Sequence, residues 1–200
     1  MKKLILTVVV LSISTFSMLA QTTATTKDGK KVILNDDGTW KYDTTVVAEK
    51  KVDLECSELI STETDKMTGK SSTASKKTLI ISDDGGKNGF GIFLMKSSNS
   101  IIFSIQAVGA GSCIDDDSKM NILFRDGTRL ELVNNGKFNC KAKFTLYFGG
   151  AFGKKKELEM LRTKEIETMR VWTSKSYVEK DFSSEQSKQL MKTVDCLNSN

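Results

Sequence analysis

The sequence predicts a mainly β fold (β-rich α+β), an antiparallel sandwich or partly open barrel with one C-terminal α-helix. Three observations lead to this prediction. Short apolar or alternating runs of strand length recur along the chain. Asp-Gly and Asn-Gly dipeptides, which favour tight turns, separate several of these runs. Only one segment, near the C-terminus, has apolar residues at clear helical spacing followed by no turn signal.

The first residues have the three parts of a secretory signal peptide. Lys2 and Lys3 precede an apolar run over residues 4–11, and Ala20 is a small residue at a suitable cleavage point. The apolar run is too short for a comfortable membrane span. We therefore expect cleavage of residues 1–20 near Ala20. The mature chain should be exported to the periplasm or secreted, soluble and without an integral membrane segment.

The mature chain divides into three parts. The sequence predicts an N-terminal β-hairpin segment at residues 21–43, with turns at Asp28-Gly29 and Asp37-Gly38. It predicts a linker at residues 44–51 and a single β-rich domain at residues 52–200.

Most of the domain's strands follow from its apolar and alternating runs. We expect strands at residues 78–82, 90–95, 101–108, 121–124, 143–148, 166–173 and 176–182. Both faces of the segment 90–95 are apolar, which predicts a central strand covered on both sides. Residues 157–163 fit a helical turn or a strand, and we favour a strand. The Ser-, Thr- and Lys-rich segment 61–77 predicts a mobile loop, because it has almost no apolar surface to bury.

One helix is predicted from about residue 184 to 197. Ser183 and Gln186 have the spacing of a capping box at its start. Its apolar face consists of Leu190, Val194 and Leu197. Cys196 lies away from this face, where it is suited to bond another segment.

Two stretches of the chain align without a gap, residues 27–40 and residues 125–138. The alignment pairs Asp28-Gly29 with Asp126-Gly127 and Asp37-Gly38 with Asn135-Gly136. An internal duplication would explain this similarity. We favour the alternative that two β meanders use the same turn chemistry independently.

The four cysteines predict two disulfides, because an exported protein matures in an oxidising compartment. Three connectivities are open. We favour Cys113–Cys140, which brackets a predicted hairpin, and Cys56–Cys196, which joins the start of the domain to its end. A zinc site is disfavoured because no two cysteines have the C-x-x-C spacing.

Composition excludes several functions. The chain has no histidine, which rules out Ser–His–Asp and Cys–His mechanisms and His-ligated metal sites. Its formal charge is +5, and loss of Lys2 and Lys3 lowers this to +3. Such a charge is too weak to indicate attachment to nucleic acid or to a membrane. We therefore expect no nucleic-acid partner.

Three segments approach known ligand-binding motifs without matching them. The acidic run 115–117 fails as an EF-hand, because Lys119 and Met120 stand where an oxygen ligand and a glycine are needed. The glycine-rich segment 148–155 is one residue too short for a phosphate loop. Residues 109–111 lack the third glycine of a dinucleotide-binding loop. We interpret all three as turns and predict no metal-binding residue, no cofactor-binding residue and no cofactor.

Two further groups of residues are candidates for function. Paired carboxylates could hydrolyse glycans, and the strand candidates are Glu131, Glu157, Glu159, Glu165, Glu167 and Glu179. We interpret them as solvent-facing partners of lysines and predict no catalytic residue. Aromatic residues could stack on sugars or partner proteins, and the candidates are Trp40, Tyr147, Trp172 and Tyr177. Our interpretation is that most of them are core or half-buried.

Two parts of the chain are similar to known sequences. Residues 28–29, 31–32, 34 and 36–40 carry the first similarity: this segment resembles one that follows the signal peptide in many exported proteins of Bacteroidetes, with its Asp-Gly-Thr-Trp hairpin. Residues 164–171 and 195–197 look like an uncharacterised exported family of the same bacteria. The first resemblance implies export in a diderm bacterium and a small hairpin. Neither implies an activity.

The predicted function is that of a non-catalytic binding or structural protein. Its partner would be an envelope component or another exported protein. One alternative is a hydrolase that cleaves envelope glycans with two carboxylates. The other is a β-barrel carrier of a small apolar ligand.

Overall fold

The computed structural model describes residues 22–26, 31–35, 37–42, 54–82, 85–109 and 113–199. The chain forms two compact units, Met1–Lys51 and Val52–Asn200, which are described separately. The predicted signal peptide, the turn at Asp28-Gly29 and the predicted linker lie outside the described residues.

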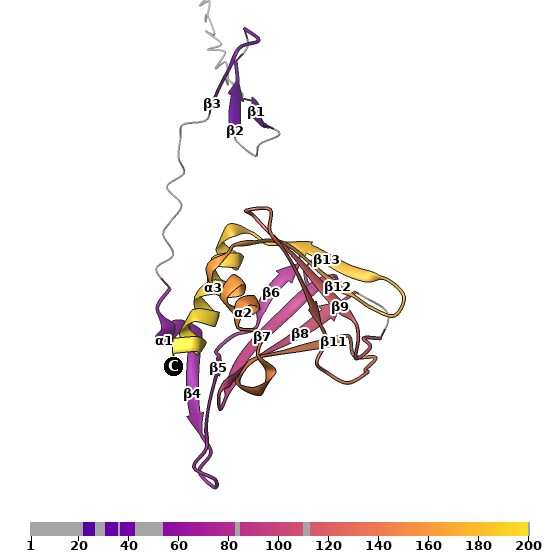
Figure 1. The fold of residues 1–200 in the computed structure, drawn as a ribbon. Coiled ribbons are helices and arrows are strands. Elements are labelled where there is room, and N and C mark those ends of the chain that lie inside the picture. Colours follow the sequence, from indigo (N-terminus) through magenta and orange to yellow (C-terminus); the bar gives the residue numbers. More distant parts are fainter. Residues whose placement is uncertain are drawn as a thin grey trace, which may run out of the picture. The chain divides into compact units, whose positions relative to one another are not determined.

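The first unit contains a three-stranded antiparallel meander (Figure 1). Its strands are β1 (Thr22–Thr25), β2 (Lys31–Leu34) and β3 (Trp40–Tyr42). Val32 is buried, whereas the rings of Trp40 and Tyr42 are exposed and meet edge to face at 5.2 Å between centroids. The expectation that Trp40 is core or half-buried is therefore wrong.

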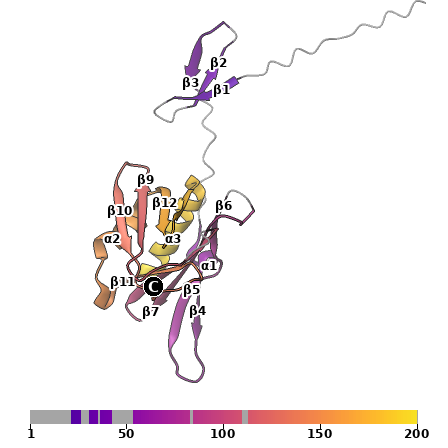
Figure 2. The same cartoon turned by 90° about the vertical axis from the view of Figure 1, so that its right-hand side faces the viewer.

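The second unit contains two antiparallel sheets and three α-helices among its described residues (Figures 1 and 2). Its elements are α1 (Cys56–Leu59), β4 (Ile60–Thr64), β5 (Ser71–Ser75), β6 (Leu79–Ser82), β7 (Gly89–Ser97), β8 (Ser100–Val108), β9 (Lys119–Phe124), β10 (Arg129–Val133), β11 (Lys143–Gly149), the 3-10 turn η1 (Gly150–Phe152), α2 (Lys155–Thr163), β12 (Ile166–Trp172), β13 (Tyr177–Asp181) and α3 (Ser184–Ser199). The larger sheet has the order β11-β8-β7-β5-β4, with β6 also paired to β7, and the smaller sheet has the order β10-β9-β12-β13.

The two sheets bury their inner faces in one hydrophobic core. Alternation places every second side chain of each strand inside, as in Ile101, Phe103 and Ile105 of β8. The inner residues Met120, Ile122 and Phe124 of β9 belong to the same core. Helix α3 packs against α1, α2 and strands of both sheets (Figure 1). The predicted β-rich fold with a C-terminal helix is therefore confirmed; among the described residues the sheets do not close into a barrel.

The predicted C-terminal helix begins with the expected capping box. The Ser183 backbone N–H donates to Gln186 Oε1 at 2.9 Å, and the Gln186 N–H donates to Ser183 Oγ at 3.1 Å. The side chains of Leu190, Val194 and Leu197 are buried, as predicted. Cys196 is also buried, so this helix has a wider buried face than its leucine and valine spacing indicates.

The strand prediction for residues 157–163 is wrong, because this segment belongs to helix α2. Leu158 and Leu161 are both buried, and their spacing of three residues places them on one helical face. Arg162 forms an ion pair with Glu159 at 2.9 Å, which is also a helical spacing.

The loop prediction for residues 61–77 is also wrong, because β4 and β5 form a hairpin there. Hydroxyl groups pair across it at 2.8 Å, Thr62 with Thr73 and Thr64 with Ser71. At its turn, Asp65 Oδ1 accepts backbone N–H bonds from Met67 and Thr68. Backbone ladders and hydroxyl pairs thus order a hairpin that has almost no apolar surface to bury.

The turns at Asp37-Gly38 and Asp126-Gly127 are correctly located but differ from the expected two-residue type. In the turn of residues 35–39, the Asn35 N–H donates to Thr39 O, and in residues 124–128 the Phe124 N–H donates to Thr128 O. The glycine of each turn has a φ close to +80°, the left-handed region. This pattern is typical of a type I turn followed by a glycine bulge.

Asp126-Gly127 therefore has a structural counterpart in Asp37-Gly38. Asn135-Gly136 is not a hairpin turn, because the strand that follows it, β11, pairs with β8 in the other sheet. The gapless alignment of residues 27–40 with 125–138 thus pairs Asp37-Gly38 with a turn that is not equivalent to it, and the described residues give no support to a duplication in that register.

One face of the segment 90–95 differs from the prediction. Phe90, Ile92 and Leu94 are fully buried in β7, but Phe93 and Met95 on the opposite face are only partly buried. The strand is central in its sheet, as predicted, but it is not covered on both sides. In the described part of the chain no helix has the length and hydropathy of a membrane span.

Candidate functional site

The outer face of the smaller sheet carries the most developed cluster of polar and aromatic side chains. Alternation turns Met120, Val171 and Val178 inward and leaves the intervening residues of each strand outside. These outward residues line an open groove of about 650 Å3. We call this surface the groove; its lining residues on the outer face are Asn121, Leu123, Arg129, Glu131, Thr168, Arg170 and Glu179. Figure 2 shows β10, β9 and β12 side by side.

The strand register places four polar residues in a row across the groove floor. Glu131 of β10 lies opposite Asn121 of β9, Asn121 lies opposite Arg170 of β12, and Arg170 lies opposite Glu179 of β13. The Asn121 amide donates to Glu131 Oε2 at 3.2 Å. Arg170 binds Glu179 through two nitrogen atoms, at 2.6 and 2.5 Å. The row is therefore held by contacts between its own members.

Two aromatic rings lie at one end of this row. Trp172 and Tyr177 are 38% and 45% exposed, and their ring centroids are 5.2 Å apart. The indole N–H of Trp172 donates to Asn121 Oδ1 at 2.7 Å. The Arg170 guanidinium lies 4.4 Å from the centre of the Tyr177 ring and 5.4 Å from that of Trp172. Both rings are exposed, so the expectation that they are core or half-buried is wrong for them.

The charges of this face are close to balance. Its outward strand residues include three bases, Lys119, Arg129 and Arg170, and four acids, Glu131, Glu167, Glu179 and Asp181. Lys119 forms an ion pair with Glu131 at 2.8 Å. The hydrogen bond from Lys119 lowers the pKa of the Glu131 carboxyl, and the same contact raises the pKa of Lys119. Both groups are therefore charged at neutral pH.

The groove contains two of the carboxylates named for hydrolysis, Glu131 and Glu179. They stand on the two edge strands of a four-stranded sheet, and three strand spacings separate them by about 14 Å. The carboxylates of glycosidases are about 5–10 Å apart, and the acid of the pair has a raised pKa. Glu131 instead has a lowered pKa. This pair does not provide the chemistry that the hydrolase hypothesis requires.

The other candidate glutamates also have basic partners or lie elsewhere. Glu157 and Glu159 are on helix α2, not on a strand, and Glu159 binds Arg162. Glu165 lies 3.4 Å from Arg125 and accepts a hydrogen bond from Ser184. Their interpretation as partners of lysines thus holds for Glu131 and Glu165, which pair with Lys119 and Lys188. The partners of Glu159 and Glu179 are arginines instead.

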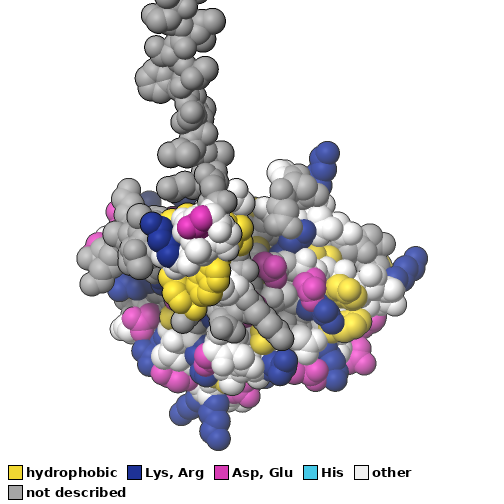
Figure 3. Space-filling model, turned by 90° about the horizontal axis from the view of Figure 1, so that it is seen from above, with side chains coloured by type: hydrophobic (Ala, Val, Ile, Leu, Met, Phe, Trp, Pro, Cys, Tyr) yellow, Lys and Arg dark blue, Asp and Glu magenta, His cyan; other side chains and the backbone are white. Residues whose placement is uncertain are grey.

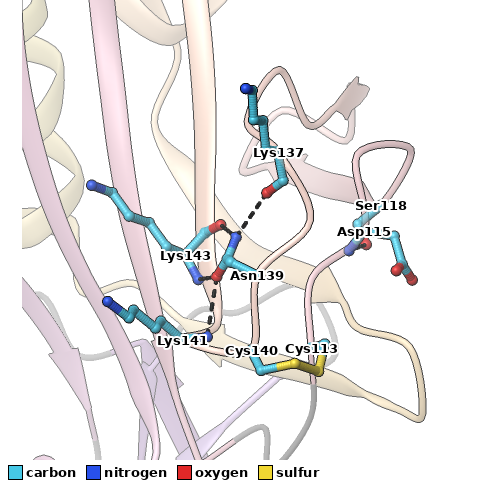
Figure 4. The surroundings of a disulfide bond; sticks show 8 residues. All are labelled: Cys113, Asp115, Ser118, Lys137, Asn139, Cys140, Lys141 and Lys143. Carbon is cyan, nitrogen blue, oxygen red and sulfur yellow. Dashed lines mark hydrogen bonds between the residues drawn. A yellow bond between two sulfur atoms is a disulfide. The ribbon is translucent and has the colours of Figure 1, made fainter.

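The four cysteines form the two pairs that the sequence favours, Cys56–Cys196 and Cys113–Cys140. The first joins α1 to α3. The second ties the segment before β9 to the segment before β11. Figure 4 shows the surroundings of the second bond, where the Asn139 amide binds the backbone of Lys137, Lys141 and Lys143.

The remaining predicted turns have structural roles. The acidic run 115–117 is a turn closed by a bond from the Asp115 N–H to Ser118 Oγ. Among the described residues, no group of three or more cysteine or acidic side chains is placed to hold a metal ion. The glycine-rich segment forms the 3-10 turn η1 and leads into α2. Residues 110–112 lie outside the described part of the chain.

A second hollow, of about 210 Å3, lies between α1, α3 and the larger sheet. Its apolar lining consists of Leu54, Leu59, Leu79, Ile92, Leu94 and Leu190. Pockets for molecules of drug size have about 300–1,000 Å3 and enclose most of the ligand. This hollow is smaller than that, which weakens the carrier hypothesis.

Glu131, Glu179, Trp172 and Tyr177 are among the candidates predicted from the sequence, but the polar residues between them, Asn121 and Arg170, are not. The alternation of buried and exposed side chains along a strand would have been enough to place Asn121 and Arg170 on the outer face. Both alternate with buried residues on short strands, and Arg170 stands two positions before Trp172. What the sequence does not give is the order of strands that brings β9 between β10 and β12.

A family model described as "Protein of unknown function (DUF3157)" matches residues 2–89. The match reaches the first residue of β7 and ends before all the strands that form the groove. No curated protein and no protein of solved structure matches the chain. The family description assigns no activity, so a function has to be argued from the groove.

Proposed function

We propose that this chain is an exported, non-catalytic binding protein, and that its groove binds a neutral saccharide of the cell envelope. The export part rests on residues 1–20 and on the resemblance of residues 25–42 to segments of exported Bacteroidetes proteins. Two disulfides support it, because such bonds persist in oxidising compartments.

The observation that carries the binding proposal is the cluster of Arg170, Trp172 and Tyr177 at the end of a hydrogen-bonded polar row. Sugars offer an apolar face of C–H groups and a rim of hydroxyls. Exposed aromatic rings can contact the former, and planar carboxylate, amide and guanidinium groups can bond the latter.

The balance of charge favours a neutral ligand. Every acid of the row already has a cation or an amide as partner, so the groove offers hydrogen bonds without an excess of either charge. A charged ligand would have to displace one of these ion pairs. The contacts within the row also hold its side chains before a ligand arrives, which reduces the entropy lost on binding.

Fluorescence of Trp172 tests this proposal. The chain has two tryptophans, so the Trp40→Phe variant leaves Trp172 as the sole reporter. Titration with neutral oligosaccharides, such as fragments of envelope glycans, should give a saturable change in emission. Replacing Trp172 by Ala should weaken binding in calorimetry at least tenfold, as expected for an aromatic ring that stacks on the ligand. The matched control is Val133→Ala, which removes an exposed apolar side chain from the same face outside the lining residues.

Two outcomes would contradict the proposal. No saturable response to any neutral saccharide would refute the ligand class. Equal affinity of the Trp172→Ala variant and the parent would show that the ligand does not contact the aromatic rings at the end of the row, and would refute the binding mode.

A further inference from the structure

The larger sheet has an outer face of a very different character. Its adjacent strands β6, β7, β8 and β11 contain no Asp or Glu in any position. The strand register places Tyr147 of β11, Ile102 of β8 and Met95 of β7 in one row across the outer face. Phe93 lies on the same side of β7 as Met95, and all four side chains are only partly buried. The centre of this face is therefore apolar and free of negative charge.

Two exposed phenylalanines flank strand β11. Phe138, in the segment before the strand, is 60% exposed, and Phe152, in the turn after it, is 50% exposed. The Phe152 ring stacks on Tyr147 at 4.8 Å between centroids, which places it over the outer face. Exposed aromatic rings next to lysines are typical of segments that insert into the interfacial region of a bilayer.

Lysines accompany both phenylalanines. From residue 132 to 156 the chain has six lysines, no arginine and no acid. These lysines are Lys137, Lys141, Lys143, Lys154, Lys155 and Lys156. In Figure 4 the side chains of Lys141 and Lys143 extend to the same side of the chain. The Asn139 side chain accepts the backbone N–H groups of both residues, at 3.2 and 2.9 Å, so their spacing is fixed by an ordered segment.

The charge of this region is segregated from the rest of the chain. Without Lys2, Lys3 and these six lysines, the chain has fewer bases than acids, 22 against 25. The face in Figure 3 has basic and acidic side chains intermingled. The outer face of the smaller sheet also carries both signs, three bases and four acids. The weak overall charge therefore conceals one strongly basic stretch of the sequence, residues 132–156, which includes β11 and the segments on both sides of it.

We propose that the outer face of β6, β7, β8 and β11, with its two phenylalanines and its lysines, docks onto the surface of an anionic lipid membrane. The lysines complement the negative charge of lipid phosphates, and the apolar centre and aromatic rings enter the interface. A soluble polyanion would use the lysines but gain nothing from Phe138 and Phe152. The docking face and the groove lie on the outer sides of two sheets that share one core, so docking leaves the groove accessible.

Vesicle sedimentation tests this proposal. The protein is the exported form without residues 1–20, because the apolar run 4–11 would itself bind lipid. It should bind vesicles of phosphatidylcholine mixed with phosphatidylglycerol and not vesicles of phosphatidylcholine alone. Binding should weaken as salt is added, because salt screens the attraction of the lysines.

Charge variants locate the binding face. The variant Lys137→Gln/Lys141→Gln/Lys143→Gln should bind anionic vesicles on the order of a hundredfold more weakly, since each lysine near an anionic surface contributes about fivefold. The matched control, Lys66→Gln/Lys70→Gln/Lys175→Gln, removes the same charge from exposed positions of two hairpins elsewhere. It should change binding by about twofold or less. Equal losses in both variants would overturn the proposal.

A third variant separates a lipid surface from a soluble polyanion. Phe138→Ser/Phe152→Ser changes only exposed side chains and should weaken vesicle binding at least tenfold, because two aromatic rings no longer enter the interface. Unchanged vesicle binding in this variant, with full competition by dextran sulfate, would assign the lysines to a polyanion and overturn the proposal. Trp172→Ala should leave vesicle binding unchanged, so failure of the groove proposal would not affect this result.

Discussion

The Cys56–Cys196 disulfide should stabilise the protein more than Cys113–Cys140. The first closes a loop between residues 140 positions apart, and the second closes one of 27. Loop-closure entropy in the unfolded chain then corresponds to about 5 kcal/mol for the first bond and about 3.6 kcal/mol for the second. Cys196 is also 3% exposed, so its replacement by alanine removes a buried sulfur atom in addition. The difference between the two double variants should therefore exceed about 1 kcal/mol.

Urea unfolding of the parent, of Cys56→Ala/Cys196→Ala and of Cys113→Ala/Cys140→Ala measures both losses without reductant. The free energy of unfolding should fall in the order parent, second variant, first variant. With reductant present, the parent should lose the advantage of both bonds and become less stable than either variant measured without it. A larger loss in the Cys113–Cys140 variant would show that loop length does not govern these contributions, and native-state packing around the exposed bond would have to be the cause.

Three further predictions follow from the same structure. The buried Ser187 hydroxyl accepts a backbone N–H at 2.7 Å beside the bulge of β12, so Ser187→Ala should cost about 1–3 kcal/mol in urea unfolding. Gly89→Ala would place a Cβ 2.0 Å from a carbonyl oxygen of β6 and should destabilise by at least about 2 kcal/mol more than Gly91→Ala, whose Cβ would lie 3.3 Å from the methyl group of Thr78. The hydrogen bond from Lys164 lowers the pKa of Asp126 from 3.8, so its stabilising effect is complete above about pH 4 and is lost as pH falls toward the folded-state pKa. Thermal unfolding should therefore show Asp126→Asn to be less stable than the parent at pH 7, with a gap that narrows below about pH 4.

Much of the architecture follows from local patterns in the sequence. The alternation of apolar and polar residues predicts strands β8, β9, β11, β12 and β13 with nearly their observed bounds. The capping box gives the start of α3. These elements are readable because the residues that define them lie next to one another in the chain.

Two of the errors share a physical origin, since each segment makes contacts with elements outside it in the sequence. The hairpin of β4 and β5 forms because hydroxyls pair across it and β5 continues the ladder of β7. Residues 157–163 form a helix because Leu158 and Leu161 reach a shared core. In the same way, the groove depends on the order β10-β9-β12-β13, which places Asn121 beside Arg170, residues that are 49 positions apart.

The net charge of the chain is a poor guide to membrane binding for a related reason. A sum over the chain treats Glu131 and Lys143 as cancelling, although they lie on different sheets. Attraction to a charged surface decays within a Debye length of about 8 Å at physiological salt, so only charges close to that surface contribute. A protein with a weak total charge can therefore bind an anionic membrane strongly, provided that its lysines lie on one side. If both proposals hold, this protein would be retained at a membrane surface by one sheet while the other sheet stays available to bind a glycan.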